Sequence, residues 1–86
     1  MNVWLAQVLL RSNGTHYNNV VGVFKSPSMA TECALEAARD MAGEFFRTSL
    51  HKSDFKPGVS LESGHELIYE GERFGVLVSI RNVEVK

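Results

Sequence analysis

Residues 12–19 read SNGTHYNN and separate two apolar runs, at residues 3–11 and 20–24. Asn13-Gly14 is a strong signal for a two-residue β-hairpin, because a type I′ turn needs positive φ at both central residues. The run that follows the octet is rich in the β-branched and aromatic side chains that favour strands. The octet therefore predicts that the chain opens with a β-hairpin.

The same octet carries more polar and aromatic side chains than a turn requires. A turn at residues 13–14 sets Leu10 opposite Tyr17 and Arg11 opposite His16, while a looser loop through residues 18–19 is the alternative. Tyrosine with asparagine is typical of recognition loops, because it combines rigid contact area with adaptable hydrogen bonding. The partner-binding residues predicted on this basis are His16, Tyr17, Asn18 and Asn19. The alternative is that Tyr17 packs across from Leu10 and that the asparagines tolerate left-handed backbone.

The first apolar run alternates between two faces, as a strand does. One face has Trp4, Ala6, Val8 and Leu10, and the other has Val3, Leu5, Gln7 and Leu9. Because both faces are mostly apolar, we expect an interior strand that is covered on two sides.

A helix is predicted to begin at Ser26-Pro27. Serine is a good N-cap, and proline fits the first helical position because its missing amide has no partner there. The helix is expected to end near Arg47, with an earlier end at Gly43 as the alternative. Its apolar stripe is predicted to contain Ala30, Cys33, Ala34, Ala37, Ala38, Met41 and Phe45.

The second half of the chain predicts two more strands. Periodicity is lost over residues 48–60, where Pro57-Gly58 indicates a turn. Residues 65–70 and 74–85 are the predicted strands, with a tight reversal at residues 70–72. A bulge or a break is expected near Asn82, where the alternation changes parity. The result is one domain, residues 1–86, of the α+β class. It has ββαββ order and a mostly antiparallel four-stranded sheet with one helix packed on one face. Strands 3–11 and 74–85 are expected to be central.

Composition narrows the functions that we expect. The chain has 86 residues and a net charge of −1, so no general attraction draws it to nucleic acid or to anionic lipid. A single cysteine excludes an internal disulfide and is typical of a reducing, cytoplasmic location. The apolar amino terminus lacks the features of a signal peptide, and no apolar run is long enough to span a bilayer.

The sequence supports neither catalysis nor a cofactor. The three histidines, His16, His51 and His65, lack the spacing of a zinc site. Cys33 lies in an alanine-rich stripe, where we expect it to face the core as a small apolar residue. Glu62, Glu66, Glu70 and Glu72 are most simply explained as a solvated strand face and its turn. We therefore expect no enzyme, no metal and no bound cofactor.

Residues 47–58 form a basic segment with one aromatic side chain. Arg47, Lys52 and Lys56 outnumber Asp54, and Phe55 lies among them. Basic side chains around an aromatic ring are a minimal stacking platform for single-stranded nucleic acid, which is the alternative function. The net charge and the four glutamates that follow oppose that alternative. Arg47, Lys52, Phe55 and Lys56 therefore join the candidate partner-binding residues.

Self-association is also predicted. One helix covers one face of the sheet, so the apolar residues on the other face need a partner. The predicted homodimer contact contains Val3, Leu5, Leu9 and Leu77, and the alternative is that a different protein uses the same face.

The run VVGVFKSPSMATECALEAA, residues 20–38, leads a strand through Ser-Pro into an alanine-rich helix. It resembles a pattern in small uncharacterised proteins of bacteria and their phages and covers about a fifth of the chain. The resemblance implies a compact accessory protein and transfers no functional residue. With the absence of catalytic motifs, it predicts a non-enzymatic protein-binding module, a regulatory or accessory factor such as a phage-encoded modulator of a host protein.

Overall fold

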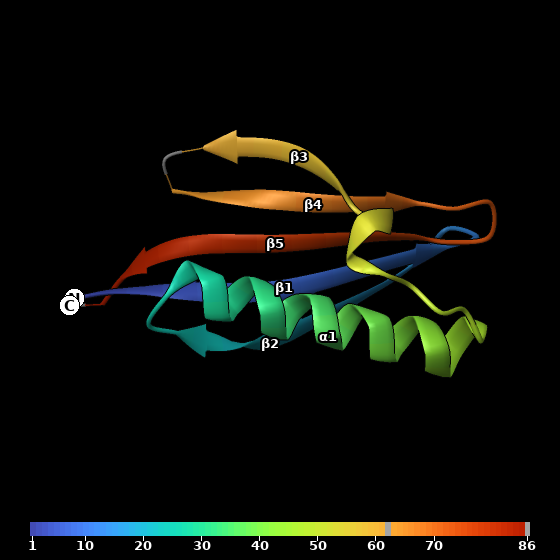
Figure 1. Cartoon of the computed structure of the whole chain (residues 1–86), viewed down its shortest axis with the longest axis horizontal. Coiled ribbons are helices and arrows are strands. Elements are labelled where there is room, and N and C mark those ends of the chain that lie inside the picture. The colour runs from blue at the N-terminus through green and yellow to red at the C-terminus, as the bar shows by residue number, and fades with distance from the viewer. Residues whose placement is uncertain (62, 86) are drawn as a thin grey trace.

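The computed structural model describes residues 1–61 and 63–85 and has one α-helix packed on one face of an antiparallel sheet (Figure 1). The sheet has five strands, in the order β2-β1-β5-β4-β3. Along the chain the elements are β1 (Asn2–Ser12), β2 (Thr15–Phe24), α1 (Pro27–Phe46), the short 3-10 helix η1 (Lys52–Asp54), β3 (Lys56–Leu61), β4 (Gly64–Glu70) and β5 (Gly75–Glu84). The α+β class is confirmed, whereas the predicted four strands become five.

The β1–β2 hairpin has the predicted turn and register. Asn13 has a φ of 50° and Gly14 a φ of 78°, as a type I′ turn requires. Leu10 pairs with Tyr17 and Arg11 with His16. The looser loop is not formed, because β2 already begins at Thr15 and contains both asparagines.

The helix α1 begins and ends where the sequence predicts. The Ser26 hydroxyl accepts a hydrogen bond of 3.1 Å from the Met29 amide, and Pro27 is the first helical residue. Gly43 does not end the helix, which continues to Phe46. At the C-cap, Arg47 has left-handed backbone with a φ of 49°. Its N–H donates to the Gly43 carbonyl, and the N–H of Thr48 donates to the Ala42 carbonyl.

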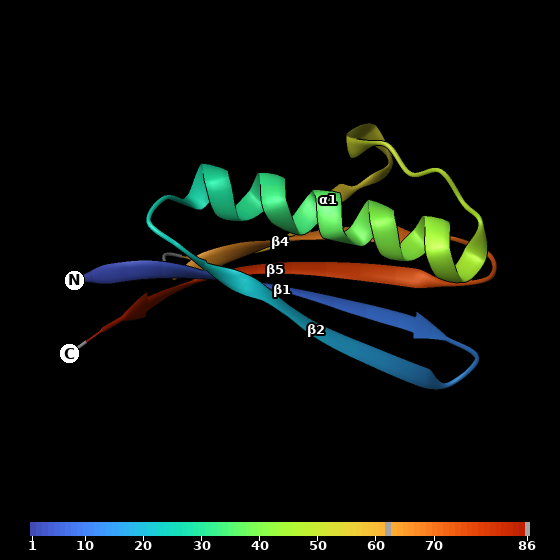
Figure 2. The same cartoon turned by 90° about the horizontal axis from the view of Figure 1, so that it is seen from below.

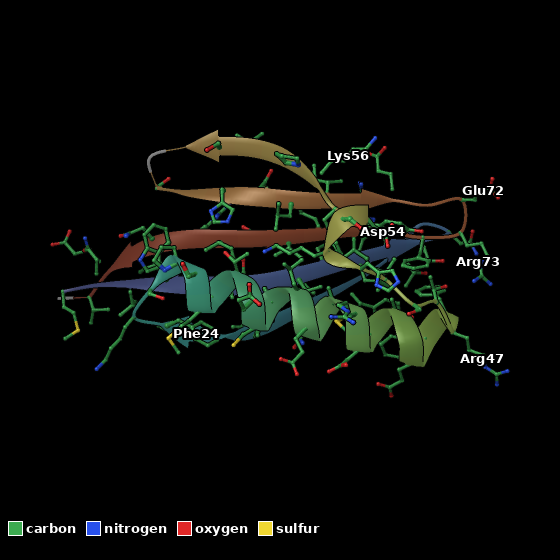
Figure 3. All side chains as sticks on the ribbon, in the orientation of Figure 1. Phe24, Arg47, Asp54, Lys56, Glu72 and Arg73 are labelled. Carbon is green, nitrogen blue, oxygen red and sulfur yellow. The ribbon has the colours of Figure 1, made fainter. Side chains whose placement is uncertain are left out.

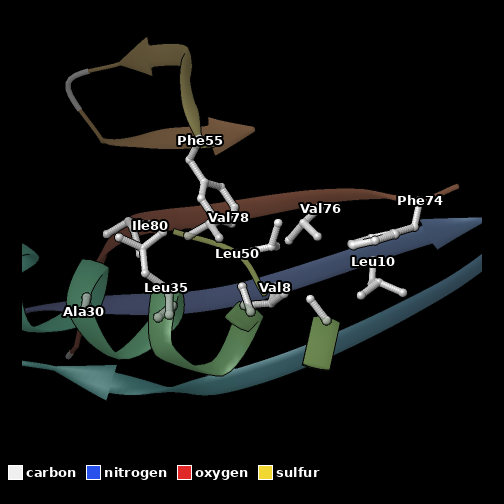
Figure 4. Packing of buried hydrophobic residues seen from close by; sticks show 14 residues of the cluster. Val8, Leu10, Ala30, Leu35, Leu50, Phe55, Phe74, Val76, Val78 and Ile80 are labelled. Carbon is white, nitrogen blue, oxygen red and sulfur yellow. The ribbon is translucent and has the colours of Figure 1, made fainter. Parts of the chain in front are cut away.

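The buried stripe of α1 is rotated from the predicted one. Ala30, Ala34 and Ala38 are buried as expected, together with Leu35 and Ala42, which the prediction left out. Cys33 is half-buried rather than in the core, and Phe45 is 55% exposed. The rotation follows from the segment after the helix, because Leu50 and Phe55 extend the core on the Leu35 side (Figure 4).

The fifth strand, β3, corrects the prediction of an irregular segment with a turn at Pro57-Gly58. Residues 56–61 pair with β4, with a shift of register between Pro57 and Ser60. At Gly58 an added Cβ would lie 2.8 Å from Cδ1 of Ile68, so the backbone passes close to β4. Proline and glycine remove the alternation of a regular strand, and an edge is where a sheet tolerates proline.

The strands β1 and β5 lie in the interior of the sheet, as predicted, and they are neighbours. The expected bulge near Asn82 is wrong, because the register with β1 continues without interruption from Gly75 to Glu84. Val83 pairs with Val3 and lies on the same face of the sheet as Val3. The apolar residues of β5 therefore change from the α1 face, at Val76, Val78 and Ile80, to the opposite face at Val83, and the strand stays regular. The irregularity in β1 pairing lies instead beside Ala6 and Gln7, where Val21 is the extra residue of β2.

The core lies between the sheet and α1 (Figure 4). The largest wholly buried side chains, Val8, Leu10, Val76, Val78 and Ile80, come from β1 and β5. An aromatic stack closes the core at the end of the helix: the rings of Phe46 and Phe74 are 4.2 Å apart, and Tyr69 lies 5.3 Å from Phe74.

Candidate functional site

The predicted recognition residues of the octet are divided between the two faces of the sheet. They belong to β2, and successive strand residues point to opposite sides. Tyr17 and Asn19 pair with Leu10 and Val8 on the face that carries α1, whereas His16 and Asn18 lie on the other face. The octet is therefore a hairpin turn and the start of a strand, and its four candidates do not form a single site.

Tyr17 nevertheless stays accessible. Its ring packs on Phe45 at the end of α1, with centroids 5.9 Å apart and an interplanar angle of 8°. It lies across from Leu10, as the alternative interpretation expected. Both rings are still about half exposed, at 50% for Tyr17 and 55% for Phe45. This stacked pair is an aromatic ridge on the β2 side of the molecule.

The basic segment 47–58 does not form a stacking platform. Phe55 is 7% exposed and packs 6.2 Å from the ring of Tyr69, so it cannot offer a face to a base. Arg47 and Lys56 lie at different sides of the molecule (Figure 3). The ammonium group of Lys52 lies 3.7 Å from the carboxylate of Glu32. The three basic groups are thus dispersed, and the aromatic ring is part of the core.

The face of the sheet opposite α1 has an apolar centre. Figure 2 shows α1 and η1 on the same side of the sheet. On the other side, Leu9 pairs with Leu77 and Leu77 with Ile68, which makes an apolar row across β1, β5 and β4. Among the described residues, no element lies over this row. We call this side the open face; its apolar residues are Val3, Leu5, Leu9, Val20, Val23, Ile68, Leu77 and Val83.

Charged groups of both signs surround the apolar row. Arg81 pairs with Leu5, and Glu66 pairs with Ser79 on the next position along the sheet. At the far end, Gly75 separates Arg11 from Glu70. Glu62, the remaining predicted strand carboxylate, lies outside the described residues. An apolar centre with mixed charges at the rim is the composition of a protein–protein contact rather than of a phosphate-binding surface.

A cleft lies between α1 and the segment that follows it. This cleft has a volume of about 790 Å³, and its charged walls are Glu32, Glu36, Arg39, Asp40, Arg47 and Lys52. Acids and bases are equal in number there, so the cleft carries no net charge to select a ligand. Cys33 is half-buried at its wall.

Reactive side chains are dispersed over the fold. The Nε2 atom of His65 lies 3.2 Å from the Thr31 hydroxyl, which joins β4 to the first turn of α1. Over residues 1–61 and 63–85, no three His, Cys, Asp or Glu side chains come together to hold a metal ion. No helix in the described part of the chain is long and apolar enough to cross a membrane.

Comparisons with protein-family models, with curated proteins and with solved structures found no match to this chain. The sequence pattern predicted Val3, Leu5, Leu9 and Leu77 on the open face but not Val20 and Val23 of β2. Ile68 and Val83 were also missed. Their alternation was readable in the sequence, whereas their position beside Leu77 and Val3 depends on strand order, which no local signal supplies.

Proposed function

We propose that this chain is a non-enzymatic protein-binding module, a small accessory factor that holds its partner against the open face. The observation that carries the proposal is the apolar row formed by Leu9, Leu77 and Ile68 across three neighbouring strands. Monomeric proteins rarely expose contiguous apolar patches larger than a few hundred Å². A row of this kind is expected to be covered when the protein works.

The size of the open face suits a protein partner. Four strands about 4.8 Å apart and nine residues of about 3.3 Å each span a flat area of roughly 570 Å². Side-chain relief increases the accessible area, so the face approaches the roughly 800 Å² per partner of a standard interface. A partner with an apolar centre, a carboxylate for Arg81 and a cation for Glu66 would complement it.

Nucleic acid is the less well supported alternative. Nucleic-acid binding would require the ring of Phe55 to stack on a base, but that ring is only 7% exposed. The basic groups around it are divided between the C-cap of α1, η1 and β3. On the open face Glu66 and Glu70 lie among the cations Arg11 and Arg81, so this face lacks the continuous basic surface that phosphate favours.

The proposal is tested by comparing what three immobilised forms of the chain retain from a lysate of the native host. The test variant replaces Leu9→Thr and Leu77→Thr together, because threonine is polar but keeps strand propensity. The matched control is Met29→Gln, which removes a 56% exposed apolar side chain from α1 instead.

A protein partner should be retained by the wild type and by Met29→Gln. Its recovery should fall by about tenfold or more with the double variant, a change of about 1.4 kcal/mol in binding. Circular dichroism must show that all three forms are folded. Equal recovery by the double variant would overturn the proposal, as would recovery of nucleic acid or a metabolite without any protein.

A further inference from the structure

The two edges of the sheet differ in how they are protected. The β3 edge has Lys56, Pro57 and an irregular register, all of which hinder pairing with another strand. The β2 edge has ten residues, Thr15–Phe24, and these include no Asp, Glu, Lys, Arg or Pro. A long edge strand without such residues presents unpaired backbone N–H and C=O groups to solvent. From this asymmetry we infer that β2 pairs antiparallel with β2 of a second copy, which joins two sheets into one.

The longest stretch in which β2 pairs regularly with β1 is the first part of β2. The extra residue Val21 interrupts the pairing with β1, so residues 15–20 form the uninterrupted stretch. Every residue of this stretch is exposed. The contact is therefore expected to be centred within residues 15–20.

Symmetry determines how the copies are arranged. Identical strands that pair antiparallel in one sheet are related by a two-fold axis perpendicular to that sheet, so both copies of α1 lie on the same side. One residue then lies opposite its own copy. Asn18 suits that position, because its carboxamide both donates and accepts hydrogen bonds. His16 then lies opposite Val20 of the second copy.

The side chains along the β2 edge are compatible with pairing to a second copy of the same strand. Because the edge strand has no fixed charge, two copies can approach without like-charge repulsion. The exposed apolar groups beside it, Tyr17, Val20 and Phe45, would gain neighbours from the other copy.

The spacing of the helices leaves room for the aromatic ridge. In each copy α1 lies over β1, between β2 and β5 (Figures 1 and 2). The two β1 strands would be three strand spacings apart, about 14 Å. Packed helices are about 8–10 Å apart, so large side chains must fill the groove between them. Tyr17 and Phe45 lie on the β2 side, where they can do so.

The paired stretch buries the area of a small interface. With Asn18 on the axis, residues 15–21 of the two copies lie side by side over about 23 Å, and a sheet with its helix layer is about 20 Å thick, which gives roughly 460 Å² per copy. Sequence analysis placed self-association on the open face. The β2 edge leaves that face free for a different protein, so this inference does not depend on the proposed function.

Sedimentation of the full chain at high micromolar concentration tests the edge contact. The wild type should have twice the mass of the chain. Asn18→Lys should sediment as a monomer at low salt, because two lysines would face each other, and should keep its circular dichroism spectrum. Ser60→Lys on the β3 edge is the matched control and should remain a dimer. A monomeric wild type would overturn the inference.

Disulfide formation tests the register. In a Cys33→Ala background, Asn18→Cys should form a covalent dimer under mild oxidation, because opposite residues of paired strands have Cα atoms about 4.5–5.5 Å apart. Lys56→Cys on the other edge is the control and should not. Equal crosslinking of the two variants would overturn the pairing. So would a dimer that survives Asn18→Lys but is lost with Leu9→Thr and Leu77→Thr, since self-association would then use the open face.

Discussion

Two neighbouring leucines of β1 are expected to differ sharply in what they contribute to stability. Leu10 is 0% exposed between the sheet and α1, whereas Leu9 is half-buried on the open face. Leu10→Ala should lower the free energy of unfolding by about 2–5 kcal/mol, because it removes buried carbon and leaves a cavity. Leu9→Ala should cost about 1 kcal/mol, because its carbons are partly in water and no closed cavity forms.

The difference is large compared with the stability of the whole chain. The free energy of unfolding of a domain of 86 residues is expected to be about 4–13 kcal/mol, so Leu10→Ala removes a substantial part of that free energy. At about 4–8 °C per kcal/mol, the melting temperature of Leu10→Ala should fall by roughly 8–40 °C and that of Leu9→Ala by roughly 4–8 °C. Urea titration followed by the fluorescence of Trp4, the single tryptophan, gives both free energies.

Equal losses for the two variants, unchanged over a range of protein concentrations, would refute the assignment of Leu9 to an uncovered face. A loss for Leu9→Ala that grows with protein concentration would instead show that a second copy covers it. Dilution therefore separates an error in the fold from association through the open face.

Three further substitutions test the local geometry by thermal melting. Gly14→Val should cost about 1–2 kcal/mol, because a β-branched residue at a φ of 78° is strained; an unchanged melting temperature would contradict the type I′ turn. Arg73→Ala should cost about 1 kcal/mol, because Nη2 of the guanidinium donates to the Phe46 carbonyl at 3.1 Å and to the Thr48 hydroxyl at 3.2 Å at the end of α1; an unchanged melting temperature would contradict a stabilising role for these bonds. Gly64→Ala should cost more than about 2 kcal/mol, because its Cβ would clash with the carbonyl oxygen of Ile80; a mild effect would mean that β4 and β5 are farther apart there.

Local signals predicted the first half of the fold well. Asn13-Gly14 specifies a two-residue turn, and the turn then sets the register of β1 against β2. Ser26-Pro27 specifies the start of α1 because both residues act through their own backbone and side chain. In each case the physical cause lies within a few residues of the structure that it produces.

Contacts between distant segments explain what the sequence did not predict. Residues 56–61 become a strand because β4 is available to pair with them, although Pro57 and Gly58 indicate a turn. Phe55 was expected at the surface beside basic residues, but the return of the chain over Tyr69 buries it. The open face likewise depends on β1, β5 and β4 lying side by side, which follows from the strand order.

The apolar row on the open face is not needed to form the sheet. On the same face, the next position along each strand is polar: Gln7 pairs with Ser79, and Ser79 with Glu66. Gln7, Ser79 and Glu66 belong to the same β1, β5 and β4 pairings as the apolar row, so polar side chains are compatible with this face of the sheet. Leu9, Leu77 and Ile68 add apolar area in contact with water, which favours association and lowers solubility. Since the fold accepts polar residues at the next position on the same face, the row supports the proposed partner contact, and substitutions in it are expected to separate binding from stability.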